Sequence, residues 1–138
     1  MVLPAALWMA AAATDGEQIA ALLRALSDAL ADGNAVRFLA QVDGESWPGY
    51  AVLRGNVVAL VAQNDVGSSV ELIESTPSGE ACHVRLDWLL QLRPASGDGS
   101  TVMRRGELRA RLERRGQRWK LVEIEPVSFF RPRGGGGR

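Results

Sequence analysis

The chain has one cysteine, one histidine and one lysine among its 138 residues, and these shortages exclude several kinds of protein. A single cysteine cannot build an intrachain disulfide framework, and one histidine beside it is too few for the usual Cys/His zinc sites. Neither sign of charge is in excess, because 16 Lys and Arg balance 16 Asp and Glu. Outside the N-terminus there is no run of about 18 apolar residues, so no internal transmembrane helix is expected.

What is present is the composition of an ordinary globular protein. Hydrophobic residues make up 46% of the chain and charged residues 23%, which excludes global disorder. A chain of this length can bury about two-thirds of its unfolded surface without a metal or a disulfide. We therefore predict one domain over residues 14–130, with no metal site and no cofactor.

The two ends lie outside this predicted domain. Residues 1–13 (MVLPAALWMAAAA) are uncharged and end in an Ala-x-Ala pattern. This is typical of a secretory signal that lacks its basic n-region, and an irregular start with an apolar first turn is the alternative. The first interpretation predicts a periplasmic or secreted protein, without membrane attachment once the signal is removed, and retention of the segment predicts a cytoplasmic one. Residues 131–138 (RPRGGGGR) predict a flexible Gly/Arg tail.

Three helices are predicted before residue 65. The first is indicated by the capping-box spacing of Thr14 and Glu17, by a stop at residues 32–34, and by an apolar stripe between them: Ile19, Leu22, Leu23, Leu26 and Leu30. The second is short and ends at Asp43-Gly44, with an apolar face made by Val36, Leu39 and Val42. The third begins at Ser46-Trp47-Pro48, ends near Asn64-Asp65, and has this apolar face: Tyr50, Leu53, Val57, Leu60 and Val61.

After Gly67 the apolar period changes from 3.6 to 2, which predicts four strands, at residues 69–75, 81–93, 101–114 and 118–130. The second strand alternates over its whole length, with these side chains on one face: Cys82, Val84, Leu86, Trp88, Leu90 and Leu92. The third sends Leu108, Ala110 and Leu112 inward. Long strands with short connections favour an antiparallel meander, and the three helices must cover its apolar face. The predicted fold class is α+β.

The order of these elements and the closing strand resemble the nuclear-transport-factor-2-like superfamily. The segment from Gly116 to Pro126 (GQRWKLVEIEP) is similar to that superfamily's closing strand, in which a glycine turn leads into a Trp-Lys-aliphatic core strand. The resemblance spans roughly residues 15–130. It implies three helices packed on a curved, cone-shaped sheet of four or more antiparallel strands, with a cavity at the open end, and homodimers through sheet faces. Ketosteroid isomerases and polyketide cyclases of this superfamily use an Asp base with Tyr or Asp donors, and that set has no match here.

The catalytic candidates reduce to one carboxylate. Cys82 and His83 are adjacent on a predicted strand, so their side chains point to opposite faces and cannot form a nucleophile–base pair. Cys82 is expected to be a structural thiol, and His83 to be solvated or in a dimer contact. Glu123 lies inside if the last strand buries Trp119 and Leu121, and burial would then raise its pKa for proton transfer. The other parity, which buries Val122 and Ile124, places Glu123 outside with Glu125, where an arginine would pair with it.

Four aromatic residues are the candidates for ligand binding: Trp47, Tyr50, Trp88 and Trp119. The three tryptophans are predicted in or near the core, where they could line a pocket for a flat apolar ligand. Tyr50 could donate to a ligand oxygen at the mouth of the cone. Ordinary packing in the core is the interpretation we prefer for all four.

Charge is distributed unevenly along the chain. Residues 1–80 carry ten acids and three bases, a net −7, whereas residues 81–138 carry six acids and thirteen bases, a net +7. Seven arginines lie between Arg104 and Arg118, which suggests a basic sheet face for an anion or a nucleic acid. Glu107 and Glu113 interrupt the row, however, and no aromatic residue alternates with the arginines as base stacking requires. We therefore expect cross-strand Arg–Glu pairs and no nucleic-acid partner.

Three hypotheses of function follow. The preferred one is a non-catalytic domain that binds a small apolar ligand or a protein partner and forms a homodimer through its outer sheet face. The second is an isomerase, cyclase or dehydratase that uses one buried carboxylate in the cone, with Glu123 as the candidate. The third is an anion-binding module that uses the arginine-rich strand.

Overall fold

The computed structural model describes residues 14–132. Its elements are α2 (Asp15–Ala31), α3 (Ala35–Leu39), α4 (Tyr50–Gln63), β1 (Asn64–Ser78), β2 (Ala81–Pro94), β3 (Val102–Arg115), β4 (Arg118–Glu125) and the 3-10 helix η1 (Val127–Phe130). The predictions of a signal at residues 1–13 and of a flexible tail, apart from its first two residues, lie outside the described residues. Among the described helices, none has both the length and the apolar content needed to cross a membrane.

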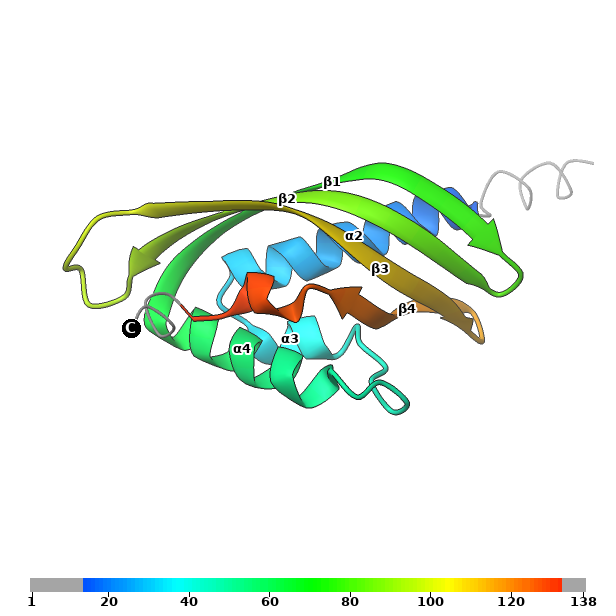
Figure 1. Cartoon of the computed structure of the whole chain (residues 1–138), viewed down its shortest axis with the longest axis horizontal. Helices are drawn as coiled ribbons and strands as arrows, with labels where there is room; N and C mark the ends of the chain where they lie inside the picture. Colours follow the sequence, from blue (N-terminus) through cyan, green and yellow to red (C-terminus); the bar gives the residue numbers. More distant parts are fainter. Residues whose placement is uncertain (1–13, 133–138) are drawn as a thin grey trace, which may run out of the picture.

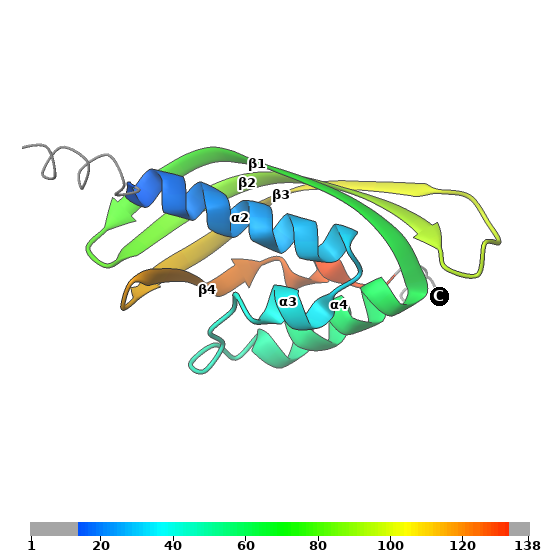
Figure 2. The ribbon, with the colours of Figure 1, turned by 180° about the vertical axis from the view of Figure 1, so that it is seen from behind.

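The four strands form one antiparallel sheet in the order β1-β2-β3-β4, as the meander predicted. Strands β1 to β3 arch over the helices, and α3 and α4 lie beneath β4 and η1 (Figure 1). Seen from behind, α2 runs along the underside of β1, against which it packs (Figure 2). The three helices therefore all lie on the concave side, and the architecture is the predicted α+β cone.

The first helix forms as its sequence indicates. The Thr14 hydroxyl accepts a hydrogen bond from the Glu17 backbone N–H at 3.1 Å, and the Glu17 carboxylate accepts one from the Thr14 N–H at 3.0 Å. This capping box satisfies two backbone donors that the first turn leaves free. The whole predicted stripe is buried beneath the sheet: Ile19, Leu22, Leu23, Leu26 and Leu30.

The alternation in β2 is also confirmed. Its even-numbered residues from 82 to 92 are buried, whereas its odd-numbered residues are half-buried or exposed. The neighbouring β3 buries Leu108, Ala110 and Leu112 on the same face. Because successive side chains of a strand alternate between faces, these two strands set which residues lie inside and outside for the whole sheet.

The predicted apolar face of the second helix is wrong at Val36, whereas Leu39 and Val42 are partly buried against the core as predicted. Val36 is 80% exposed, and the buried residue is Phe38, whose ring meets the Phe130 ring edge-on at 5.9 Å. The helix has only five residues and ends at Leu39, before Val42. A helix this short presents little more than one turn to the core, so the larger aromatic side chain takes the buried position.

The first strand is longer than predicted at both ends. It begins at Asn64, directly after α4, because the Asn64 amide donates to the Leu60 carbonyl at 3.0 Å and so caps the helix end. It also continues through Pro77 to Ser78, and the turn is confined to Gly79 and Glu80. Proline is tolerated there because β1 is an edge strand, where a missing N–H breaks no ladder bond.

The last strand is shorter than predicted. It ends at Glu125, and η1 follows in place of the strand residues expected up to Phe130. Pro126 cannot donate to a neighbouring strand, and the turn that follows it brings Phe129 and Phe130 into the core. Phe129 lies over Gly106 of β3, where an added Cβ would stand 3.0 Å from the ring.

Candidate functional site

The concave interior of the sheet is filled by aromatic side chains. Trp88 is fully buried, its ring meets the Phe130 ring edge-on at 5.2 Å, and Phe129 lies at 6.4 Å. Its indole N–H donates to the Ser68 hydroxyl at 2.9 Å, and Ser68 in turn lies 2.7 Å from the Ser27 hydroxyl of α2. Trp88 thus fills part of the interior beneath the sheet, and its one polar atom already has a partner.

The other three aromatic candidates are also used in packing. Trp119 is 7% exposed, with the Arg114 guanidinium 4.9 Å above its ring. Trp47 is half-buried and lies against Gly49, and the Tyr50 ring covers Gly44 so closely that an added Cβ would overlap it. The contacts of Trp47 and Tyr50 pack the connection between α3 and α4 against itself. All three aromatic side chains are thus engaged in packing, which is the interpretation preferred from the sequence.

Glu123 lies outside the cone. The strand buries Trp119 and Leu121 and then Val122 and Ile124, so each of the two parities considered holds for half of β4. The reason is a bulge: Leu112 of β3 faces Leu121, whereas Arg111 faces Glu123, which leaves Val122 as an extra residue. Glu123 is exposed, so the burial that the proton-transfer hypothesis required is missing.

The outer face of the sheet carries a hollow of about 440 Å³ that spans all four strands. Two rows of residues form its floor, because neighbouring strands place them opposite one another. One row runs from β1 to β4 through Thr76, His83, Arg111 and Glu123, and the next through Glu74, Arg85, Arg109 and Glu125. Bases therefore lie in the middle of the hollow and carboxylates at its two sides.

Most arginines of the basic region are paired. On the outer face Arg85 bridges Glu74 at 3.1 Å and Glu107 at 3.0 Å, and Arg105 binds Asp87 at 2.7 Å. The other ion pairs of the basic region are Arg111–Glu113, Arg114–Asp15, Arg114–Glu80, Arg115–Asp43 and Arg115–Glu113. The expected cross-strand pairs are therefore present, and the ion pairs neutralise four of the seven arginines between Arg104 and Arg118.

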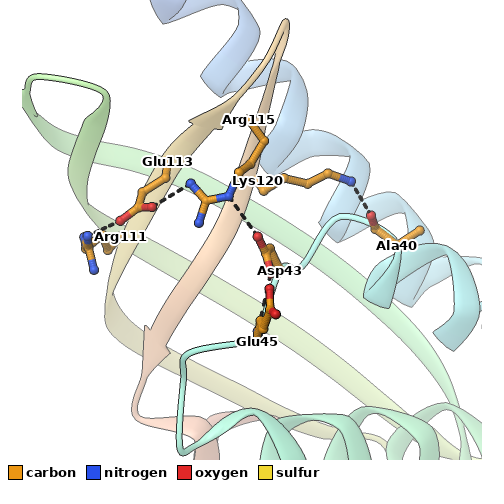
Figure 3. Close-up of polar contacts among 7 residues, drawn as sticks. All are labelled: Ala40, Asp43, Glu45, Arg111, Glu113, Arg115 and Lys120. Carbon is orange, nitrogen blue, oxygen red and sulfur yellow. Dashed lines mark hydrogen bonds and ion pairs between the residues drawn. The ribbon is translucent and has the colours of Figure 1, made fainter.

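A second hollow, of about 410 Å³, adjoins the first and shares Arg111 and Glu123 with it. It lies between the connection from α3 to α4, which contributes Trp47, and strands β3 and β4. Figure 3 shows the ion pairs along its side: the Arg115 guanidinium lies between Asp43 and Glu113, at 2.8 and 2.6 Å. Two of the predicted site residues, Trp47 and Glu123, thus line the same hollow at the border of the outer face.

Asp43 has an acid-sensitive role in this arrangement. The Arg115 guanidinium, and next the Glu45 backbone N–H, hold the pKa of the Asp43 carboxyl below its ordinary value. Because the unfolded value is about 3.9, the stabilisation is present above about pH 4 and is lost as the pH falls through the lower folded-state pKa.

We expect Asp43→Ser to lower the urea midpoint at pH 7, and the difference from the native chain to shrink below about pH 4. Urea unfolding at a series of pH values measures this difference. The control is Asp98→Ser, because Asp98 has no ion pair within residues 14–132 and should show no such trend. An Asp43→Ser difference that stays constant down to pH 2 would count against the Arg115 contact.

Within residues 14–132, no group of three or more His, Cys, Asp or Glu side chains could hold a metal ion. Cys82 is buried and its thiol pKa is raised by burial, whereas His83 is exposed on the other face, so the two remain apart as predicted. The hollow on the outer face was not predicted as a site. The alternation in β2 and β3 identifies which residues point outward. Only the pairing of the strands shows which of those residues lie side by side in the hollow.

No family model and no curated protein matches the chain. Solved structures do. A conserved protein from Planctomyces limnophilus has a TM-score of 0.68 at 13% identity, over 80% of this chain and 92% of that one. A candidate dehydratase of the NTF2-like family from Streptomyces avermitilis gives 0.64 at 15%, over 80% and 93%.

An uncharacterised protein with a cystatin-like fold from Caulobacter vibrioides gives 0.62 at 15%, over 79% and 85%. The fold is therefore the nuclear-transport-factor-2-like cone that the closing strand resembled. At these identities the similarity concerns the fold alone.

Proposed function

We propose that the chain is a non-catalytic binding domain that forms a homodimer through the outer face of its sheet. The observation that carries the proposal is the contrast between the two faces. The inner face is filled by the Trp88 and Phe130 rings and covered by three helices, whereas no described helix lies on the outer face (Figure 1). A protein partner is therefore favoured over an apolar ligand inside the cone.

The outer face has the size of a protein interface. Its strands have 15, 14, 14 and 8 residues. At about 3.3 Å per residue and 4.8 Å between strands they offer on the order of 800 Å². A standard protein–protein interface takes about 800 Å² from each partner. Half-buried Leu89 and exposed Met103 add apolar contacts to the charged side chains.

The edges of the sheet are less suitable than its face. The free edge of β1 carries Glu71, Glu74 and Pro77 and is interrupted by a bulge at Ile73. Charges, proline and bulges are the features by which natural edge strands avoid pairing with another chain. The edge of β4 is partly occupied, because Val42 forms a parallel bridge with Leu121.

The test is the mass of the native chain in solution, by sedimentation equilibrium or native mass spectrometry. We expect twice the mass of one chain. Leu89→Glu, in the middle of the outer face and opposite Arg105, should give monomers without unfolding the chain. The matched control Val58→Glu, an exposed position on α4, should leave the dimer intact. A monomeric native chain at micromolar concentration would overturn the proposal.

A further inference from the structure

A third hollow, of about 300 Å³, lies between α2 and the inner face of β1, where the helix runs along the strand (Figure 2). Ser68, Val70 and Leu72 line it from β1, because alternate residues of a strand share a face. The cover given by α2 decreases along this face, since Val66 is 8% exposed and Leu72 is 38% exposed. The space left open has the volume of a small-molecule site, for which about 300 Å³ is the lower end of the usual range.

A chain of hydrogen bonds reaches this hollow with one donor unused. The Trp88 indole N–H donates to the Ser68 hydroxyl, and the hydroxyls of Ser68 and Ser27 share one further hydrogen bond. Whichever serine donates in that bond, the other keeps a hydroxyl proton for which residues 14–132 supply no acceptor. Both serines line the hollow, and Ser27 is only 4% exposed, so little water reaches this donor. An acceptor brought by a ligand would therefore be favourable.

Two charges of opposite sign stand at the rim of the same hollow. Arg24 and Asp28 of α2 line it one helical turn apart and are both exposed. In the described part of the chain neither side chain has an ion pair, even with the other. Arginine before aspartate is the less favourable order for such a pair, because it opposes the helix dipole. Both charges thus remain available to a group from outside the chain.

The occupant that matches these groups carries two charges close together. Its carboxylate would bind the Arg24 guanidinium and accept the spare serine proton, and its ammonium group would bind the Asp28 carboxylate. A plain anion would meet Asp28 one turn from Arg24, and a plain amine would meet Arg24, so neither neutralises the rim. Leu23 and Leu72 supply an apolar wall. An α-amino acid with an aliphatic side chain combines all these features.

We propose that the hollow between α2 and β1 binds an aliphatic α-amino acid, with the carboxylate at Arg24 and the serine pair, the ammonium group at Asp28, and the side chain against Leu72. This site goes beyond the proposed homodimer and does not depend on it, because the hollow lies on the helix side of the sheet and the dimer interface on the other.

The probe is L-leucine, and two analogues each lack one of its charges. Isocaproic acid has no ammonium group, and isoamylamine has no carboxylate. Titration of the isotope-labelled native chain, followed by its amide chemical shifts, gives the three dissociation constants. We expect leucine to bind at least about tenfold more tightly than either analogue, since hydrogen bonds to charged groups have effects of this size. The shifts should be concentrated at residues 20–28 and 68–72.

Two variants assign the charges. Arg24 and Asp28 are exposed on a helix, where alanine is the best helix former, so alanine variants keep the fold. Arg24→Ala should weaken leucine binding about tenfold and should not weaken isoamylamine binding. Asp28→Ala should weaken leucine binding to a similar extent and should not weaken isocaproic acid binding. The matched control Arg54→Ala, at an exposed position of α4, should bind leucine as the native chain does.

Three results would overturn the amino-acid site. They are the absence of shifts at millimolar leucine, leucine binding no tighter than that of the analogues, and leucine affinity unchanged by Arg24→Ala or by Asp28→Ala. None of these results bears on the homodimer, whose test is the mass of the native chain.

Discussion

Replacing Trp88 by alanine should lower the free energy of unfolding by about 3–5 kcal/mol, because it deletes a fully buried indole from a close-packed core. The lost contacts include the edge-on ring pair with Phe130 and the tilted pair with Phe129, which hold η1 against the sheet. Urea unfolding of the two proteins measures the change. The comparison requires equal protein concentration, since dimerisation shifts apparent stability by mass action.

A conservative variant separates packing from the hydrogen bond. Trp88→Phe keeps most of the ring but removes the donor to the Ser68 hydroxyl, so we expect a loss of about 1 kcal/mol for the hydrogen bond with a smaller cavity term added. If the cone instead holds an open ligand cavity, Trp88→Ala would cost well under 1 kcal/mol, since a side chain at a solvated wall loses few contacts.

Gly106→Val should destabilise the chain by about 1–3 kcal/mol, the usual cost of an overpacked core position. Strand propensity alone predicts the opposite sign, because valine is favoured in strands and glycine is not. The ring of Phe129 decides between them: an added Cβ would stand 3.0 and 3.1 Å from two of its carbons, and valine adds two methyl groups beyond that Cβ. Thermal or urea unfolding gives the sign.

The contact with Phe129 is isolated by a double-mutant cycle. Combined with Phe129→Ala, Gly106→Val should cost much less than it does alone, because the clashing ring is gone. Additive effects of the two substitutions would show that the destabilisation has another source, and that η1 does not rest on Gly106.

The parts of the fold that the sequence predicted are those governed by local periodicity. The capping box at Thr14, the buried stripe of α2 and the alternation of β2 each depend on residues a few positions apart. Because these patterns agree with one another over long elements, they also predicted the order of the strands and the face that the helices cover.

The parts that could not be predicted depend on contacts distant in sequence. The bulge at Val122 exists because β3 and β4 pair on both sides of it, and nothing in the run of residues 119–125 marks where the parity changes. Phe38 is buried in place of Val36 because its ring packs against the ring of Phe130, which lies 92 positions away in the sequence. The strand predicted to continue to Phe130 ends before Pro126, which cannot donate to a neighbouring strand.

The candidate site shows the same division. The outward residues of β2 and β3 were recognised as a face, but the hollow results from register, which places His83 opposite Arg111. Glu123 was a candidate for its possible burial. It became a candidate for binding only when the bulge placed it outside, beside Arg111.

The proposed homodimer requires the outer face of the sheet to be covered in solution while the outer surface of α4 stays exposed. Solvent paramagnetic relaxation by a soluble gadolinium chelate measures this on methyl groups of the native chain. We predict that the methyl signals of Leu89 and Met103, on the outer face, are protected, and that those of exposed Val58 on α4 broaden strongly. Broadening of the Leu89 and Met103 methyl signals to the extent seen for Val58 would contradict the proposed homodimer.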